Sequence, residues 1–507
     1  MSGMVVGYGN PNEADVRLMM MKIKHRGPYA EGLFQNGRVI MSQNYLRADL
    51  PSSQGAFPIP ASRGNGDTLR ICYDGQMGDC KPLAKRNAVP DGPLMEERLL
   101  LTLYERYGHT MVQHLDDAIF SFVISDGDDF LAARDLLGIK TLFYGFKNGT
   151  LYLASELKSL TEITSDVYEF PPGHVMDMNG RLTPFAALPE NPPALWDKTV
   201  DDMAEEIRSI VQESLESRVD FSLPIGSLLS GGLDSSIVTA LACRAFRDRF
   251  GPDALFSTFA VGVGESEDIL MARKVAAHCG TEHHELIVDL DQILELLPKV
   301  IYYLESFDPS LVRSAVSNFL VSRLARKHRL EVVLSGEGGD EIFCGYAYLK
   351  SFPQEELFRR QMECIGYLHN NASLRLDRMN LCHGLRVVAP LISGKLLNYA
   401  MRIPAEYKQR IEGEDKIEKW IFRRAFEDLL PKEVAWRTKQ EFSQGSGSAR
   451  PLPRHFETVI TDEAFEEARL RFPMIRTKEE LAYFRMFIEH FGEERAVATV
   501  GQWISAD

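Results

Sequence analysis

The chain has 507 residues, of which 45% are hydrophobic and 25% are charged, and its formal net charge is −15. This length predicts two or more domains, each large enough to bury its own core. The negative charge argues against a nucleic-acid-binding surface, and the sequence has no apolar run of the roughly 18 residues that a membrane span needs.

The seven cysteines show neither a Cys-x-x-Cys pair nor a zinc-ligand spacing, since they lie at positions 72, 80, 243, 279, 344, 364 and 382. An odd number of scattered cysteines, without a signal peptide ahead of them, predicts reduced thiols and a cytoplasmic location.

The first part of the chain, residues 1–190, predicts a layered α/β domain with antiparallel sheets. Strand patterns occupy residues 4–8, 32–42, 68–74, 118–124 and 142–154, with turn signals at Asn36-Gly37 and Asn148-Gly149. Helical patterns occupy residues 14–24 and 94–107. A proline-rich segment at residues 188–195 marks the domain boundary.

From residue 200 to residue 507 the pattern changes to alternating strands and helices. Strands are expected just before Ser230 and over 256–263, 285–288 and 330–334, and helices over 201–218, 237–250, 268–279, 290–305 and 316–327. This alternation predicts a doubly wound parallel sheet. After Tyr346 the pattern is mostly helical.

The segment from Ser230 to Ser236, Ser-Gly-Gly-Leu-Asp-Ser-Ser, lies between an apolar strand and an amphipathic helix. Such a turn presents unpaired backbone N–H groups and the positive end of a helix dipole, which together bind an anion such as a polyphosphate. No Lys-Ser or Lys-Thr follows the glycines, so the turn is not a Walker A loop. Asp234 would repel a phosphate unless a divalent cation lay between them, which implies Mg2+.

A second glycine-rich turn, Ser335 to Glu341, follows the strand at 330–334 and contains three acids. In a parallel sheet the carboxyl ends of the strands meet at one edge, so Asp234 and Asp340 are expected to share the metal. A plain strand-to-helix turn without a ligand is the alternative interpretation of either segment alone.

Together the two loops resemble those of the asparagine synthetase superfamily, whose synthetase domain is an ATP pyrophosphatase of the N type. The resemblance implies ATP and Mg2+ as cofactors and a carboxylate–amine ligase that forms an acyl-adenylate and AMP. It implies that Asp234 and Asp340 hold the metal and that Glu337 is the base towards the amine. It also implies that ATP and pyrophosphate contact Leu229, Ser230, Gly232, Asp234, Ser235, Ser236, Val261 and Gly336, although Leu229 and Val261, taken alone, are typical core residues.

A third segment, Trp436 to Gly445, resembles the family pattern Trp-Arg-x-Lys-x-x-Phe-Ser-x-Gly and implies that Lys439 is the catalytic lysine. An ammonium there would neutralise charge on the α-phosphate and on the tetrahedral intermediate. The segment 415–419 resembles a lysine patch of the family, in which either Lys416 or Lys419 would contact phosphate; a solvated helix face is the alternative.

The match is weaker where the family binds its amino-acid substrate. Arg313 is retained and could pair with a substrate carboxylate, whereas Arg386 stands where the family has an acid. An amino group bound by that acid would face a cation here. The carboxylate therefore need not be free aspartate.

The N-terminal part is similar to the Ntn-type glutaminase domain of the same family, on the segments 24–28, 133–140 and 154–158. Its chemistry departs from the family at the nucleophile, the substrate-clamping arginine, the oxyanion Asn-Gly pair and the acid that binds glutamine, which here are Ser2, Tyr45, Asp74-Gly75 and Glu96. A serine hydroxyl is far less acidic than a thiol, and a carboxylate at Asp74 lacks the N–H that an oxyanion needs. We therefore expect this domain to be inactive as a glutaminase.

Three hypotheses follow. The first is asparagine synthetase-like amidation of an aspartate-type carboxylate with free ammonia. The second is a ligase for another carboxylate and amine, including intramolecular amide formation like that of β-lactam synthetases. The third is a non-catalytic scaffold. In the first two the partners are small molecules, without nucleic acid or membrane, and a homodimer is one assembly open to the chain.

Overall fold

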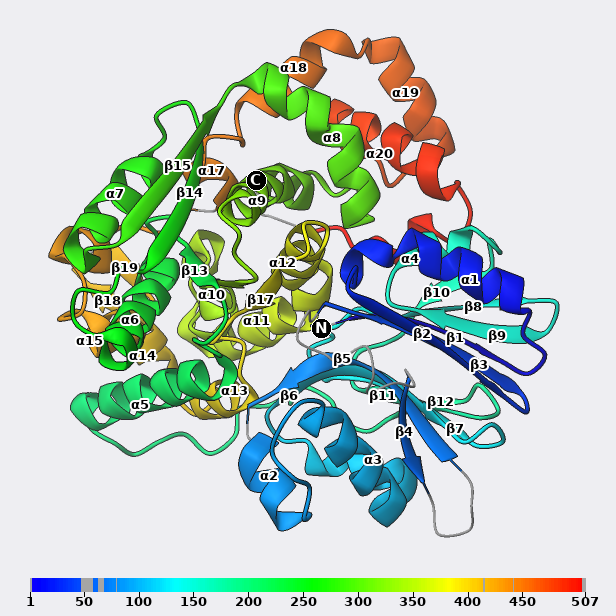
Figure 1. Ribbon diagram of the computed structural model, residues 1–507. Helices are drawn as coiled ribbons and strands as arrows, with labels where there is room; N and C mark the ends of the chain where they lie inside the picture. The colour runs from blue at the N-terminus through cyan, green and yellow to red at the C-terminus, as the bar shows by residue number, and fades with distance from the viewer. Residues whose placement is uncertain are drawn as a thin grey trace. The chain divides into compact units, whose positions relative to one another are not determined.

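The computed structural model describes residues 2–46, 58–62, 68–78, 80–413, 415–440 and 442–503. The chain forms two compact units (Figure 1). The first comprises Met1–Leu188 and His490–Val500, and the second comprises Pro189–Glu489 and Gly501–Asp507. Among the described residues, no helix has both the length and the apolar content required to cross a membrane.

The first unit contains two antiparallel six-stranded sheets. One sheet has the order β10 (Val167–Glu169), β8 (Phe143–Lys147), β9 (Thr150–Ala154), β1 (Ser2–Tyr8), β3 (Val39–Tyr45) and β2 (Ala30–Asn36). The other has the order β12 (Leu182–Pro184), β11 (His174–Asp177), β7 (Phe130–Arg134), β6 (Ala118–Ser125), β5 (Thr68–Met77) and β4 (Ile59–Ser62). The expected turn at Asn148-Gly149 is confirmed, with φ of 52° and 76° at its two central residues.

Apolar side chains of both sheets form the core between them; Met4, Val6 and Met41 from one sheet pack with Cys72 and Val123 from the other. The helices α1 (Glu13–Lys22) and α4 (Leu157–Thr161) pack on the first sheet, and α2 (Cys80–Arg86) and α3 (Met95–Tyr107) accompany the second. The result is the layered α/β arrangement that the sequence predicts.

The second unit contains a five-stranded parallel sheet. Its order is β15 (Glu282–Val288), β14 (Ser257–Val263), β13 (Ile225–Leu228), β16 (Val332–Leu334) and β17 (Arg386–Val388). Helix α6 (Leu233–Phe250) contacts both α5 (Val200–Arg218) and α7 (Glu267–Cys279). A second group, α8 (Leu290–Leu304), α9 (Pro309–Lys327) and α12 (Ala372–Leu381), consists of helices that all contact one another. The doubly wound parallel sheet is confirmed.

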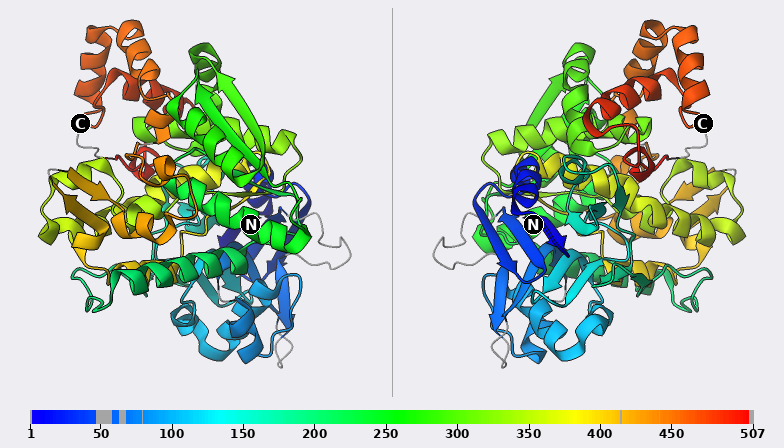
Figure 2. Two further views of the ribbon diagram at one scale, coloured as in Figure 1. Left: turned by 90° about the vertical axis from the view of Figure 1, so that its left-hand side faces the viewer. Right: turned by 90° about the vertical axis from the view of Figure 1, so that its right-hand side faces the viewer.

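The rest of this unit is mainly helical, as Figure 2 shows for its orange and red segments. The remaining helices are α10 (Gly339–Ile342), α11 (Gln354–Tyr367), α13 (Gly394–Ala400), α14 (Ala405–Lys408), α15 (Trp420–Phe426), α16 (Lys432–Ala435), α17 (Phe442–Gly445), α18 (Pro451–Val459), α19 (Asp462–Arg471) and α20 (Lys478–Phe491). The pattern missed strand β17 and the hairpin of β18 (Gln409–Glu412) and β19 (Asp415–Glu418). These strands have three or four residues each and depend on pairing with partners elsewhere, which leaves little periodicity to read.

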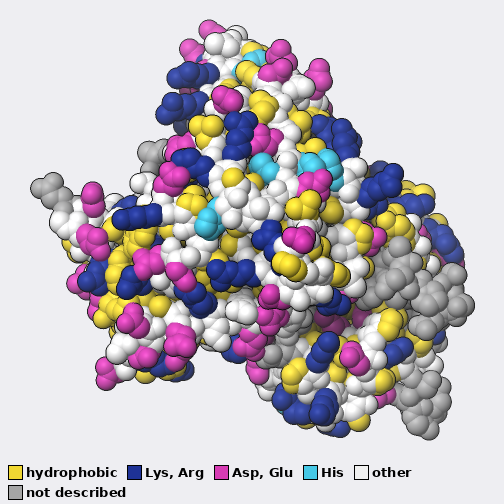
Figure 3. All heavy atoms as spheres, turned by 60° about the vertical axis from the view of Figure 1, so that its left-hand side comes forward, with side chains coloured by type: hydrophobic (Ala, Val, Ile, Leu, Met, Phe, Trp, Pro, Cys, Tyr) yellow, Lys and Arg dark blue, Asp and Glu magenta, His cyan; other side chains and the backbone are white. Residues whose placement is uncertain are grey.

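Charged side chains of both signs are interspersed on the face of the protein that Figure 3 shows, with no broad area of one sign among the described residues there.

Candidate active site

The strand order of the parallel sheet reverses between β13 and β16. In open α/β sheets, ligands bind at such a switch point, beyond the carboxyl ends of the strands. The loop after β13 and the loop after β16 are the two glycine-rich turns, and both line a pocket there. The approach is so close that a Cβ on Gly336 would lie 2.4 Å from the backbone nitrogen of Ser235. Only glycine allows this contact.

The first loop leads directly into α6, which begins at Leu233 rather than at residue 237 as the pattern predicted. Asp234 and Ser235 therefore lie in the first turn of an 18-residue helix, beside its unpaired N–H groups. Gly231 has a φ of +73°, which glycine adopts without strain. Ser230, Gly232, Asp234 and Ser235 line the pocket, whereas the fully buried Ser236 donates its hydroxyl hydrogen bond to the Gly232 carbonyl at 2.6 Å.

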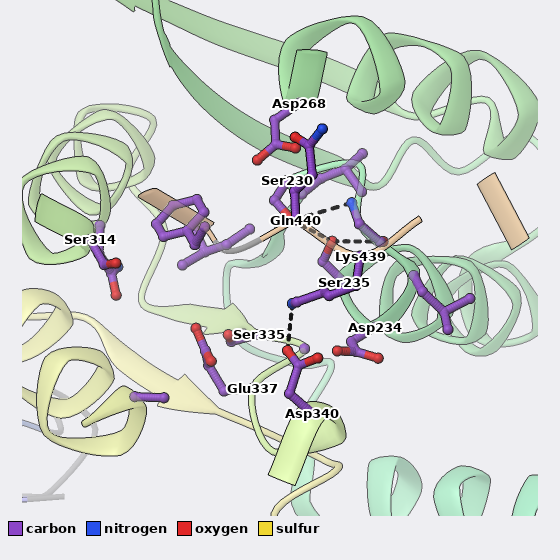
Figure 4. A pocket seen from close by; sticks show the side chains of 18 of the residues that line it. Ser230, Asp234, Ser235, Asp268, Ser314, Ser335, Glu337, Asp340, Lys439 and Gln440 are labelled. Carbon is purple, nitrogen blue, oxygen red and sulfur yellow. Dashed lines mark hydrogen bonds and ion pairs between the residues drawn. The ribbon is translucent and has the colours of Figure 1, made fainter. Parts of the chain in front are cut away.

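Two acids and two lysines meet at the bottom of this pocket. The Lys419 Nζ lies 2.5 Å from Oδ2 of Asp234 and 2.6 Å from Oδ1 of Asp340. The Lys439 Nζ lies 2.5 Å from Oδ2 of Asp340. Figure 4 shows the Asp234 and Asp340 carboxylates side by side, with Lys439 pointing at Asp340. The pocket thus holds a compact cluster of alternating charge.

The protonation of the cluster follows from its burial and its charges. Burial raises the pKa of Asp234 above the ordinary value, although Lys419 opposes this effect. Burial acts in the same direction on Asp340, but the Lys419 and Lys439 ammonium groups outweigh it and hold the pKa of Asp340 well below its usual range. Burial likewise opposes the charge on Lys439, yet Asp340 and Asp234 raise the pKa of Lys439. Lys439 therefore remains an ammonium group at neutral pH.

The two carboxylates also suit a magnesium ion. Oδ1 of Asp234 is buried and has no hydrogen-bond partner among the described residues. Mg2+ is typically bound by one or two carboxylates together with the phosphates of a substrate, and two carboxylates beside a helix N-terminus fit that pattern. No group of three or more His, Cys, Asp or Glu side chains suited to a metal occurs in the part of the chain that the structure describes.

Lys419 is brought here by a sharp change of backbone direction. It has a φ of +55° immediately before α15, and its aliphatic stem lies against Gly345, where a Cβ would be 2.0 Å from Cε of the lysine. Of the two lysines that the sequence left open, Lys419 reaches the pocket. Lys416 instead donates hydrogen bonds to the carbonyls of Lys350 and Phe352, each at 2.8 Å.

The segment that carries Lys439 is anchored on both sides of the lysine. Arg437 pairs with Asp268 at 3.0 Å, and the backbone nitrogen of Lys439 donates to Oε1 of Glu418 at 3.0 Å. Gly445 packs so closely on Asp268 that a Cβ would lie 2.3 Å from its carboxylate oxygens. Burial raises the pKa of Asp268 to about 6, with Arg437 opposing it. Glu441 of this segment lies outside the described residues.

Glu337, the expected base, lines the pocket and forms an ion pair with Arg375 of α12. The Arg375 guanidinium lies 5.2 Å from the centre of the Phe442 ring, which fixes its plane. The sequence did not single out Arg375, because it lies in no glycine-rich turn and only the packing of α12 brings it to Glu337.

The two arginines that the sequence linked to a substrate lie elsewhere. Arg313 pairs with Glu479 of α20, and Tyr483 donates a further hydrogen bond to that carboxylate at 2.8 Å. Arg386 is the first residue of β17, which pairs with β16. Neither arginine is among the described residues that line the pocket. Leu229 and Val261, which the resemblance linked to ATP, both line the pocket.

In the first unit, Ser2 is fully buried. Its hydroxyl donates to the Tyr73 carbonyl at 2.5 Å and accepts from Nε2 of Gln43 at 2.6 Å. Its backbone nitrogen donates to Oδ1 of Asp74 at 3.1 Å, and Asp74 pairs with the buried Arg26 at 2.7 Å. The Tyr45 hydroxyl donates to Gln43 at 3.0 Å. The hydroxyl of Ser2 is thus held in a buried polar network.

Gly75 and Glu96 are both in contact with the Tyr73 side chain. A Cβ on Gly75 would lie 2.4 Å from the Tyr73 ring, so the ring fills the space over this glycine. The Tyr73 hydroxyl donates to Oε2 of Glu96 at 2.6 Å, and the backbone nitrogen of Met77 donates to Oε1 at 3.3 Å. Burial, together with Glu96, holds the pKa of Tyr73 well above its ordinary value, so the phenol stays protonated.

Comparison with known proteins identifies a domain family for each of two parts of the chain. Residues 206–363 and 350–485 match the asparagine synthase domain, and residues 1–170 match a glutamine amidotransferase domain. A glutamine-hydrolysing asparagine synthetase of Lotus japonicus is 32% identical over 511 residues, covering 96% of this chain and 85% of that protein. The chain belongs to the asparagine synthetase family.

Other members of the asparagine synthetase family are equally similar. The glutamine-hydrolysing enzyme of Gallus gallus is 32% identical, with 94% of this chain and 91% of that protein covered, and asparagine synthetase 1 of Arabidopsis thaliana is 32% identical over 96% of this chain and 85% of its own length. The family and the asparagine synthase domain indicate an enzyme, an ATP-dependent amide ligase. A non-catalytic scaffold is therefore set aside.

Proposed function

We propose that this enzyme converts an aspartate-type carboxylate into its amide with free ammonia, through an acyl-adenylate. The observation that supports this most strongly is the cluster of Asp234, Asp340, Lys419 and Lys439 beside the N-terminus of α6. Two carboxylates, two ammonium groups and a helix dipole in one pocket suit a metal-bound triphosphate. The cluster therefore favours chemistry at phosphate.

The reaction needs two steps because a carboxylate has no good leaving group. In the first, a carboxylate oxygen attacks the α-phosphorus of ATP, the bond to the β-phosphate bridge breaks, and pyrophosphate leaves. In the second, ammonia attacks the acyl carbon, AMP leaves with the bonding electron pair, and one proton is released. The amide nitrogen comes from ammonia, and no oxidant or reductant is involved.

The residues of the pocket match these steps. Ser230, Ser235 and the N–H groups of α6 would hold the leaving pyrophosphate, and Lys439 would neutralise charge on the α-phosphate. Lys419 adds a second ammonium group next to the same phosphates. Mg2+ held by Asp234 and Asp340 would neutralise further charge on the leaving group.

Glu337 would accept the proton that ammonia loses. Its carboxylate lies in the pocket, and the ion pair with Arg375 fixes its direction. A general base must be held within hydrogen-bond reach of the proton that it takes, and a buried guanidinium partner supplies that positioning.

The proposal of free ammonia rests on the first unit. The family relatives named above are glutamine-hydrolysing by name, but here the Ser2 hydroxyl is held by Tyr73 and Gln43, and Tyr73 with Glu96 fills the space over Gly75. Asp74 also offers only acceptors where an oxyanion needs a donor. These features favour a glutaminase domain that keeps its fold without its activity.

A different carboxylate–amine pair is the alternative, and one observation favours it. Arg313, the remaining cation of the family's substrate segment, is paired with Glu479, whose carboxylate also accepts a hydrogen bond from Tyr483. A substrate that lacks the carboxylate of a free amino acid would leave that ion pair intact.

The test measures pyrophosphate and AMP release with Mg-ATP and L-aspartate, with either ammonium chloride or glutamine as nitrogen source. Asparagine formed with ammonium but not with glutamine supports both parts of the proposal. Asparagine formed equally well with glutamine would contradict the proposal that the first unit has no glutaminase activity. No turnover of aspartate, together with turnover of another carboxylate in a screen by pyrophosphate release, would establish the alternative.

A further inference from the structure

One face of α9 borders the candidate active site. Ser310, Ser314, Asn318 and Val321, spaced three or four residues apart, all line the pocket. Asn318 is the most informative of them, because it is only 2% exposed and its Oδ1 has no hydrogen-bond partner among the described residues. A buried carbonyl oxygen without a donor costs about 1–3 kcal/mol, so such an oxygen in a pocket points to a ligand that supplies the donor.

A series of hydrogen bonds through Asn380 and Ser322 determines which polar atom of the Asn318 amide has no partner among the described residues. Nδ2 of Asn380 donates to the Leu376 carbonyl at 2.7 Å, so Oδ1 of Asn380 is its acceptor arm. Ser322 donates its hydroxyl to that Oδ1 at 2.9 Å. The Ser322 oxygen can then only accept, and it accepts from Nδ2 of Asn318 at 3.1 Å.

These hydrogen bonds fix the orientation of the Asn318 amide. An amide that turned its oxygen towards Ser322 would place two acceptors together after the hydroxyl proton is committed to Asn380. Nδ2 of Asn318 therefore stays hydrogen-bonded to Ser322, and Oδ1 is the atom without a partner among the described residues. Asn318 lines the pocket, and the polar atom of its side chain that has no partner among the described residues is a buried carbonyl oxygen held in a defined orientation.

The surroundings of Asn318 suit a flat, apolar ring. α9 packs on β14 and β13. The ends of these two strands and Val321 of α9 give the pocket six apolar lining residues, beside the polar Ser310, Ser314 and Asn318 of α9; the six are Leu228, Leu229, Phe259, Ala260, Val261 and Val321. An anionic acyl group would find no cation among these side chains. A purine ring would bury its apolar faces there and present its polar edge.

We propose that Oδ1 of Asn318 accepts a hydrogen bond from the 6-amino group of adenine and so selects ATP over 6-oxopurine nucleotides. This inference rests on the proposed use of ATP at the same site. Hypoxanthine and guanine carry a carbonyl oxygen at position 6, which would face the Asn318 oxygen without a proton between them. Sites built to hydrogen-bond a donor reject the analogue that lacks it, because the buried acceptor stays unpaired.

The experiment is isothermal titration calorimetry of ATP and of inosine triphosphate (ITP), each with Mg2+ and without a carboxylate substrate. The wild-type protein is expected to bind ATP at least about tenfold more tightly than ITP. Asn318→Leu has a similar volume but no amide oxygen. It should lose about tenfold in ATP affinity and should bind the two nucleotides equally.

Two further variants complete the design. Ser317→Ala is the matched control, because Ser317 is a buried α9 residue that bonds Ser446 at 3.1 Å and does not line the described pocket. This control should keep the wild-type ratio of ATP to ITP affinity. Asn318→Ser, which removes the amide with less steric demand, makes the same comparison if thermal unfolding shows that Asn318→Leu is not folded.

The outcomes separate this inference from the proposed function. A wild-type protein that binds neither nucleotide contradicts the use of ATP itself. Binding of ATP with no preference over ITP, or a wild-type preference that persists in the folded Asn318 variant, overturns the role of Asn318 and leaves the ligase untouched.

Discussion

Lys439 Nζ lies 2.5 Å from Oδ2 of Asp340, which joins the segment before α17 to the loop after β16. The two residues are 99 positions apart in the sequence. Their ion pair places a permanent cation beside the proposed metal ligand, where the α-phosphate of ATP would have to lie. The catalytic role assigned to Lys439 can be tested directly.

We expect Lys439→Ala to reduce acyl-adenylate formation by at least about 10²-fold, because the other ammonium group of the pocket, that of Lys419, is held between Asp234 and Asp340. Pyrophosphate release under saturating Mg-ATP measures the effect. Lys274→Ala is the control, since Lys274 forms only an exposed pair with Glu433. Turnover of the Lys439 variant within a few-fold of this control would contradict the catalytic role.

Lys419→Met should destabilise the protein when no ligand is bound. Lys419 is buried between Asp234 and Asp340, and removing one partner of a buried ion pair typically costs about 3–5 kcal/mol. Mg2+ would supply the missing positive charge, so MgCl2 should raise the melting temperature of the variant more than that of the wild type. Thermal unfolding with and without MgCl2 measures both effects.

Lys395→Met is the comparison for that experiment, because Lys395 is half-exposed and pairs with Glu213 at the surface. Its stability should change by less than about 1 kcal/mol and its response to MgCl2 should match the wild type. Equal melting temperatures for the Lys419 and Lys395 variants would show that Lys419 does not balance the two acids.

Ser2→Cys alone is expected not to create glutaminase activity. The thiol would still lie beside Asp74, and Tyr73 would still fill the space over Gly75. Glutamate release from glutamine measures the activity, and mass spectrometry shows whether residue 2 is the N-terminal residue of the purified variant. Glutamate release at a rate similar to that of the ammonia-dependent ligase reaction would contradict the idea that the whole pocket has been lost.

The free energy of unfolding should depend on pH because of the buried Lys408. Its Nζ is buried and donates to Oε1 of Gln361 at 2.8 Å, and burial lowers the pKa of Lys408 to about 8. Between pH 8 and the ordinary lysine value near 10.5, the unfolded chain binds more protons than the folded one, so stability contributed by this group rises with pH. Below pH 8 the buried charge is fully present and costs about 3 kcal/mol.

The measurement for Lys408 is urea unfolding of the wild type and Lys408→Met between pH 7 and pH 9.5. The stability of the wild type relative to the variant should increase over the upper part of this range, because only the wild type has the titrating amine. Parallel pH profiles for the two proteins would contradict the lowered pKa.

The sequence by itself determined the parallel sheet, the two glycine-rich turns and the lysine segment. These features depend on local pattern: an apolar strand, a glycine turn and a helix are contiguous in the chain, and the loops Ser230–Ser236 and Ser335–Glu341 each carry their acids within seven residues. Strands β13, β14 and β16 occur where the pattern predicted them, because buried parallel strands are continuous apolar runs.

Only the tertiary structure decided which distant side chains complete the site. Arg375 lies on α12 and Asn318 on α9, and no local pattern distinguishes them from ordinary helix residues. Lys419 lies just before α15, and the sequence left it open together with Lys416. They reach the pocket because those helices pack around the switch point of the sheet. By the same packing Arg313, which the sequence linked to the substrate, is paired with Glu479 instead. Such choices depend on contacts between residues more than 35 positions apart, which periodicity does not encode.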